Sequence, residues 1–157
     1  MKVVLLKPEI PQNTGNIARL CACTGMQLML VGPLGFSLEN KYLKRAGLDY
    51  WDYVNVSYIK DLGSFLKLYP ETVNNYFFIS TKGRKLYNQI EISKDKDLLL
   101  IFGNETRGLP GCFYITYPDN LYRIPMVGAA RSLNLSNSVA IVVYHFLEKS
   151  NFLSILN

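Results

Sequence analysis

The chain has 157 residues, of which 49% are hydrophobic and 18% charged, so its composition excludes a disordered protein and predicts one globular domain over residues 1–157. A net charge of +5 permits a polyanionic partner without requiring one. The first apolar run, residues 3–6, is too short for a signal peptide or a membrane span, so we expect a cytoplasmic protein with no membrane partner. Cys21, Cys23 and Cys112 lack metal-ligand spacing and indicate reduced, small apolar side chains.

Short apolar runs alternate with helical patterns along the chain. We predict strands at residues 3–6, 28–31, 54–58, 76–80, 98–102 and 121–124. Helices are predicted from Asn13 or Thr14 to Thr24 and at residues 38–46, 62–68 and 132–149, with about one helical turn at 109–114. Several strands are continuous apolar runs, which is typical of a parallel sheet covered on both faces. The sequence therefore predicts an α/β fold with a mostly parallel sheet flanked by helices.

In such sheets ligands bind beyond the carboxyl ends of the strands, where loops are expected after Ser80, Phe102 and Ile124. The loop after Phe102 reads GNETRGLP, and its two glycines allow the backbone to approach a ligand closely. Glu105 could accept hydrogen bonds from a ribose or an amine; the alternative is a plain strand-to-helix turn with a surface ion pair. The loop matches neither a Walker loop nor the dinucleotide-binding fingerprint.

The segment PEIPQNTG opens the first predicted helix. Asn13, Asn16 and Arg19 are spaced by three residues, so we expect them on one helix face near the N-terminus, where an adjacent arginine favours a phosphate. The alternative is that Asn13 or Thr14 caps the helix and Arg19 is solvated. Capping would account for Asn13 but not for Asn16.

Two basic clusters are candidates for contacts with a nucleic-acid backbone. One contains Lys41, Lys44 and Arg45, and the other contains Lys82, Arg84 and Lys85. A solvated charged face is the alternative interpretation of each cluster, and phosphate binding is the functional one.

The segment from Ile124 to Tyr144 passes from a short strand through a small-residue loop into the last helix. The start of this helix is rich in polar side chains, and we expect that end to be buried. Buried polar groups need partners, and a ligand with donors and acceptors of its own could supply them. The polar residues are Arg131, Ser132, Asn134, Ser136 and Asn137.

The ordered blocks PEIPQNTGNIARLCACTG, LLLIFGNETRGLP and RIPMVGAARSLNLSNSVAIVVYHF resemble the three motifs of the SPOUT superfamily of methyltransferases. The resemblance covers nearly the whole chain, and GPLGF, KRAGLDYWD and STKG between the motifs agree with it. It is closest to the minimal SPOUT proteins that methylate the ribose 2'-oxygen of the tRNA wobble nucleotide, a cytidine or a modified uridine. The resemblance implies a trefoil knot in the C-terminal half, a homodimer, no separate RNA-binding domain and no obligate protein partner.

The resemblance also implies S-adenosylmethionine as cofactor, S-adenosylhomocysteine as product, no metal, and roles for particular residues. The catalytic candidates are Arg19, Asn16, Ser132 and Asn134. The candidates for binding the cofactor are Ile79, Ser80, Thr81, Gly103, Asn104, Glu105, Gly108, Ile124, Pro125, Met126, Ser132 and Leu133. The candidates for binding tRNA are Arg19, Lys41, Lys44, Arg45, Lys82, Arg84 and Arg107.

Two positions depart from the family pattern. Asn104 stands where relatives often have proline, and we expect the loop to tolerate it because asparagine adopts unusual backbone angles. The linker of residues 128–130 stands where relatives usually carry an acidic or polar residue, so we expect no catalytic role for a side chain in this linker, while the cofactor site formed by backbone groups should stay intact. Two alternative functions are methylation of ribosomal RNA and RNA binding without catalysis.

Overall fold

The computed structural model describes residues 1–38, 53–71, 74–91, 97–128 and 130–152. The basic helix expected at residues 38–46, with Lys41, Lys44 and Arg45, lies outside the described residues except for Leu38. Within the described part of the chain, no helix is long and apolar enough to cross a membrane.

The core of the fold is a seven-stranded sheet in the order β3-β2-β1-β6-β4-β7-β5. The predicted α/β fold with a mostly parallel sheet is confirmed, with one strand more than expected. Every pairing among the described strands is parallel, so the carboxyl ends of all the strands lie along one edge of the sheet. The central pair, β1 and β6, joins residues about a hundred positions apart, with Lys2 opposite Leu99. The strands are β1 (Lys2–Leu6), β2 (Gln27–Val31), β3 (Val56–Ile59), β4 (Asn74–Ile79), β5 (Lys85–Leu86), β6 (Asp97–Phe102) and β7 (Leu121–Arg123).

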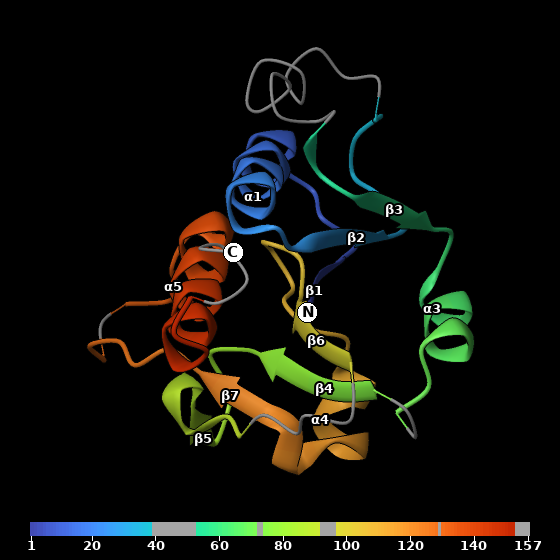
Figure 1. The fold of residues 1–157 in the computed structure, drawn as a ribbon. Helices are drawn as coiled ribbons and strands as arrows, with labels where there is room; N and C mark the ends of the chain where they lie inside the picture. The colour runs from blue at the N-terminus through green and yellow to red at the C-terminus, as the bar shows by residue number, and fades with distance from the viewer. Residues whose placement is uncertain (39–52, 72–73, 92–96, 129, 153–157) are drawn as a thin grey trace.

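Helices cover both faces of the sheet (Figure 1). On one face lie α1 (Pro11–Thr24) and α5 (Leu135–Lys149), which pack against each other. On the other face lie α3 (Leu62–Leu68) and α4 (Gly111–Thr116). Alternate strand residues point to opposite faces and form two apolar cores. Leu5, Leu100 and Phe102 join the core beneath α1 and α5, whereas Leu6, Leu99 and Ile101 join the core beneath α3 and α4.

The structure corrects several predicted boundaries. The third strand is Val56–Ile59 rather than 54–58, α4 is Gly111–Thr116 rather than 109–114, and α5 begins at Leu135 rather than at residue 132. The two-residue strand β5 was not predicted, because so short a segment carries no apolar periodicity.

The cysteines only partly match their prediction. Cys21 is buried in α1, and burial raises the pKa of its thiol to about 12, so the side chain is a neutral apolar group. Cys23 and Cys112 are exposed rather than packed in the core. Among the described residues, no three His, Cys, Asp or Glu side chains gather as they would to hold a metal ion.

Candidate functional site

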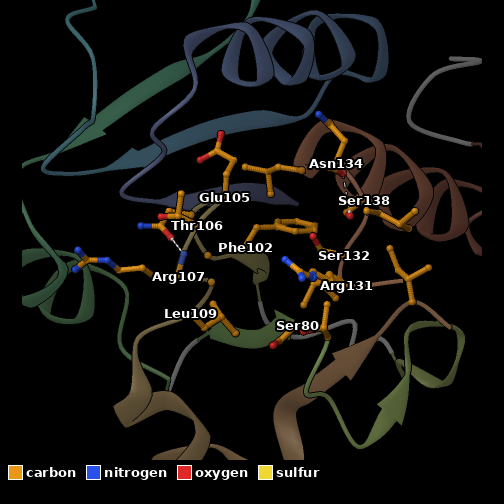
Figure 2. A pocket seen from close by; sticks show the side chains of 18 of the residues that line it. Ser80, Phe102, Glu105, Thr106, Arg107, Leu109, Arg131, Ser132, Asn134 and Ser138 are labelled. Atoms are coloured by element: carbon orange, nitrogen blue, oxygen red, sulfur yellow. Dashed lines mark hydrogen bonds between the residues drawn. The ribbon is translucent and has the colours of Figure 1, made fainter. Parts of the chain in front are cut away.

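A cavity of about 580 Å³ opens at the carboxyl edge of the sheet, a size typical of sites for small molecules and cofactors. It lies beyond the ends of β6, β4 and β7, which are neighbours in the sheet. The structure therefore brings together the three loops predicted after Ser80, Phe102 and Ile124. Figure 2 shows the segment with Glu105 and Arg107 on one side of the cavity and the segment with Ser132 and Asn134 on the other.

Most of the residues predicted for the cofactor line this cavity. The exception is Pro125, which lines a smaller cavity of about 220 Å³ that shares Thr81, Ile124 and Met126 with the first. The predicted residues in the larger cavity are Ile79, Ser80, Thr81, Gly103, Asn104, Glu105, Gly108, Ile124, Met126, Ser132 and Leu133.

Glu105 caps the N-terminus of helix α1 from a loop more than ninety residues away. Its carboxylate accepts hydrogen bonds from the backbone N–H groups of Glu9 at 2.9 Å and Ile10 at 3.2 Å. It also accepts one from Nδ2 of Asn13 at 2.9 Å. Ile10 occupies the N-cap position and has no polar side chain, so the carboxylate of Glu105 takes the place of a side-chain cap by binding the backbone N–H of Ile10 and of Glu9 before it.

Asn13 connects Glu105 to the second helix at the cavity, α5. Its Oδ1 accepts a hydrogen bond from Nδ2 of Asn134 at 3.0 Å. Asn134 is the N-cap of α5, and its Oδ1 accepts from the backbone N–H of Ser136 at 2.8 Å. One hydrogen-bonded chain, Glu105–Asn13–Asn134, thus links the first, second and third sequence motifs at one point beside the cavity.

The prediction that Asn13 or Thr14 caps α1 is wrong. The helix already begins at Pro11, and both side chains lie inside it and are buried. The prediction that Asn13, Asn16 and Arg19 share one face holds only in part. Asn16 and Arg19 are both exposed, whereas Asn13 is buried, because each step of three residues falls about 60° short of a full turn and the two steps add up to about 120° between Asn13 and Arg19.

Asn16 and Arg19 do not line the cavity of the single chain, although both were predicted as catalytic residues. The other two catalytic candidates, Ser132 and Asn134, do line it. They are exposed together with Arg131, so the polar start of the last helix lies at the surface of this chain and not at a buried end.

Glycines allow the loop after β6 to fold back on itself. A Cβ on Gly103 would lie 2.0 Å from the carbonyl carbon of Gly108, which no side chain tolerates. Gly108 has a φ of +70°, the left-handed region that glycine adopts without strain. Asn104 pairs with Gly108 through two backbone hydrogen bonds but does not have a positive φ, so the expected reason for asparagine at this position is wrong.

Tyr114 of α4 was not predicted as a site residue, but it lines the cavity. Its hydroxyl lies 2.8 Å from Oγ of Ser80, and Nζ of Lys82 lies 5.4 Å from the centre of its ring. Ser80 is also fixed by a backbone N–H bond to the carbonyl of Tyr122 at 2.8 Å. The sequence carries no signal for Tyr114, because it reaches the cavity only through the packing of α4.

The charged lining of the cavity is mostly basic. Lys82, Arg107 and Arg131 line it, and Glu105 is the one acidic residue among the described lining residues. Arg107 extends away from the middle of the cavity in Figure 2. Arg84, which was also predicted to contact RNA, is exposed and does not line the cavity.

Comparison with known proteins agrees with this arrangement. Residues 1–144 match the SpoU rRNA Methylase family. The tRNA (cytidine(34)-2'-O)-methyltransferase of Escherichia coli strain K12 is 45% identical over 145 residues, which cover 92% of this chain and 90% of that protein. The chain therefore belongs to the SpoU rRNA methylase family.

Solved structures of similar proteins share the whole architecture. A structure from work on 2-OH methylation of C/U34 on tRNA has a TM-score of 0.86 and 38% identity, and the match covers 96% of each chain. The SpoU methyltransferase AviRb of Streptomyces viridochromogenes, solved with AdoMet, has a TM-score of 0.81 at 20% identity. Its match covers 96% of this chain and 58% of AviRb, and it shows that the two proteins share a fold.

Replacing Asn13 with alanine tests the chain of hydrogen bonds. The substitution leaves Oε1 of Glu105 and Nδ2 of Asn134 without this partner, so we expect the free energy of unfolding to fall by about 1–3 kcal/mol. Urea denaturation followed by circular dichroism measures it. Gln12→Ala, at an exposed neighbouring position of α1, is the control and should change stability by less than about 0.5 kcal/mol. Equal effects of the two substitutions would contradict the role given to Asn13.

Proposed function

We propose that this protein transfers a methyl group from S-adenosylmethionine to the ribose 2'-oxygen of nucleotide 34 of a tRNA, a cytidine or a modified uridine. The observation that carries the proposal is the cavity at the carboxyl edge of the sheet, with three sequence motifs joined beside it by Glu105, Asn13 and Asn134. The E. coli tRNA (cytidine(34)-2'-O)-methyltransferase supports the choice of nucleotide, because it is 45% identical over 92% of this chain and 90% of its own.

The residues of the cavity fit a nucleoside with a charged tail. Apolar surface comes from Ile79, Phe102 and Leu109, and hydroxyl groups come from Ser80 and Ser132. A planar base packs well on apolar side chains, whereas ribose and carboxylate oxygens need donors such as hydroxyl and backbone N–H groups. When bound, S-adenosylmethionine supplies an electrophilic methyl group.

Glu105 is poorly suited to remove the proton from the ribose hydroxyl. Its two carboxylate oxygens already accept hydrogen bonds from the backbone N–H groups of Glu9 and Ile10 and from Nδ2 of Asn13, so they are committed to holding the start of α1. Arginine is an equally poor base because its guanidinium stays protonated at neutral pH. We assign Arg19 the binding of the nucleotide's phosphate and the stabilisation of negative charge that develops on the 2'-oxygen.

Arg19 and Asn16 contribute to a cavity only if a second chain supplies them, because both lie outside the cavity of their own chain. We propose a homodimer in which the exposed side of α5 and the start of α1 form the interface, and Arg19 of the partner subunit completes each site. Ile141 and Tyr144 support this, since they lie three positions apart on α5 and are 36% and 49% exposed.

Methylation of tRNA from cells that lack this protein tests the proposed function. Purified protein with labelled S-adenosylmethionine should place one 2'-O-methyl group on nucleotide 34. An anticodon stem-loop with 2'-deoxyribose at that nucleotide should accept no label, because the acceptor oxygen is missing. Label on ribosomal RNA instead would favour the rRNA alternative, and calorimetry without S-adenosylmethionine binding would favour an RNA-binding protein without catalysis.

Charge reversal at Arg84 tests the basic surface around the cavity. Arg84→Glu should weaken tRNA binding by about fivefold at 0.15 M salt and lower its salt dependence, because a phosphate contact is lost. Cofactor affinity should not change, since Arg84 does not line the cavity. Lys82→Glu should affect both ligands because Lys82 lines it. Lys67→Glu, at an exposed position of α3, is the control. Unchanged tRNA affinity in Arg84→Glu would remove Arg84 from the proposed RNA-binding surface.

Replacing Ile141 with lysine tests the dimer. Light scattering after gel filtration should give twice the chain mass of 17.9 kDa for the natural protein and the single mass for Ile141→Lys, because the ammonium group would be buried without a partner. Ile115→Lys, at a residue of α4 that is 83% exposed, should leave the dimer intact. Dimers of unchanged stability in Ile141→Lys would place the interface elsewhere.

A further inference from the structure

Glu9, in the loop between β1 and α1, has no role in the function described so far, yet its side chain is fully engaged. Its Oε1 accepts a hydrogen bond from Nδ2 of Asn104 at 3.1 Å, and its Oε2 accepts one from Oγ1 of Thr106 at 2.6 Å. The two donors flank Glu105, which itself accepts from the backbone N–H of Glu9. Two glutamates therefore hold the loop before α1 to the loop after β6: Glu9 binds the side chains of Asn104 and Thr106, and Glu105 binds the backbone N–H of Glu9.

This contact fixes the turn of the loop that lines the cavity. Oδ1 of Asn104 accepts a hydrogen bond from the backbone N–H of Arg107 at 2.7 Å, while its Nδ2 donates to Glu9. Asn104 thus connects Glu9 to the far side of the turn, next to Gly108. Asn104, Thr106, Arg107 and Gly108 all line the cavity, whereas Glu9 does not.

Gly35 positions Glu9 from the opposite side. Its backbone N–H donates to the carbonyl of Pro8 at 2.9 Å. A Cβ at Gly35 would lie 2.8 Å from Cα of Glu9 and 3.2 Å from its Cβ, so only glycine permits this approach. The GPLGF segment therefore supports the Glu9 loop.

We propose that Glu9 is a positioning residue, which holds residues 104–108 in the conformation that binds the methyl donor. This inference rests on the proposed function for the identity of the ligand. The side chain of Asn104 supplies the restraint, because it binds Glu9 through Nδ2 and the backbone N–H of Arg107 through Oδ1. An ordered loop binds its ligand more tightly because less conformational freedom is lost on binding.

The variant Glu9→Gln tests the proposal because glutamine keeps the shape but cannot accept from both Asn104 and Thr106. Hydrogen–deuterium exchange of peptides covering residues 103–109, in protein without cofactor, should become at least about tenfold faster, because the charged acceptor of both bonds is replaced by a neutral amide with a single acceptor oxygen. Calorimetry should show S-adenosylmethionine binding about tenfold more weakly, with KM for the cofactor raised and KM for tRNA unchanged. The urea midpoint should barely move.

Three further variants separate positioning from general damage. Gly35→Ala should reproduce the faster exchange, because it displaces Glu9 without removing the carboxylate. Thr106→Val should add little to Glu9→Gln in the double variant, since both remove the same bond. Glu71→Gln makes the same change of charge at an exposed residue before β4, at the opposite edge of the sheet, and should leave exchange and affinity as they are.

The outcomes distinguish this proposal from the proposed function. Unchanged exchange of residues 103–109 in Glu9→Gln would overturn the positioning role, whatever ligand the cavity binds. Faster exchange with unchanged S-adenosylmethionine affinity would also overturn it, because the loop would then be ordered without consequence for the ligand. The third outcome is faster exchange in Glu9→Gln while the natural protein itself does not bind S-adenosylmethionine. This would support the restraint of the loop by Glu9 and reject the methyl donor as the ligand of the loop.

Discussion

Two helices begin at the cavity, and a single carboxylate determines how they meet. Helix α1 has no polar side chain at its N-cap, and Glu105 from the loop after β6 binds the backbone N–H groups of Glu9 and Ile10 there instead. Asn13 donates a hydrogen bond to Glu105 and accepts one from Asn134 at the start of α5. Because Asn13 is buried and uses both its amide oxygen and its amide nitrogen in these bonds, the loss of either partner leaves a buried polar atom unpaired, which couples the three residues. The shape of the cavity follows from that geometry.

The parallel sheet decides where this contact can form. The chain leaves β1 toward α1 on one face, whereas it leaves the neighbouring strand β6 toward α4 on the other face. The loops after these strands therefore diverge at the carboxyl edge and leave a crevice between them, as in other open α/β sheets. Glu9 and Glu105 sit at that divergence, and each binds donors of the other loop.

Much of the fold could be predicted because strands buried on both faces appear as uninterrupted apolar runs. Residues 3–6, 28–31 and 98–102 lie in the strands β1, β2 and β6, and the loop after Phe102 lies at the cavity as expected. Asn13 could not be interpreted correctly, because a sequence shows the donors at a helix start but not an acceptor that arrives from residue 105. Tyr114 was missed for a similar reason, since packing alone brings it to Ser80. The knot stays a prediction of the family resemblance.

The pairing of β1 with β6 also has a consequence for synthesis of the chain. The first sixty residues contain β1, β2 and β3, which pair in parallel and bury one edge of β1. The N–H and C=O groups along the other edge of β1 have no strand partner until residues 97–102 leave the ribosome. The unpaired edges of strands with apolar side chains promote aggregation, and contacts between distant residues form slowly. Strand β1, which supports the site, is therefore also a segment at which the nascent chain can aggregate before residues 97–102 are made.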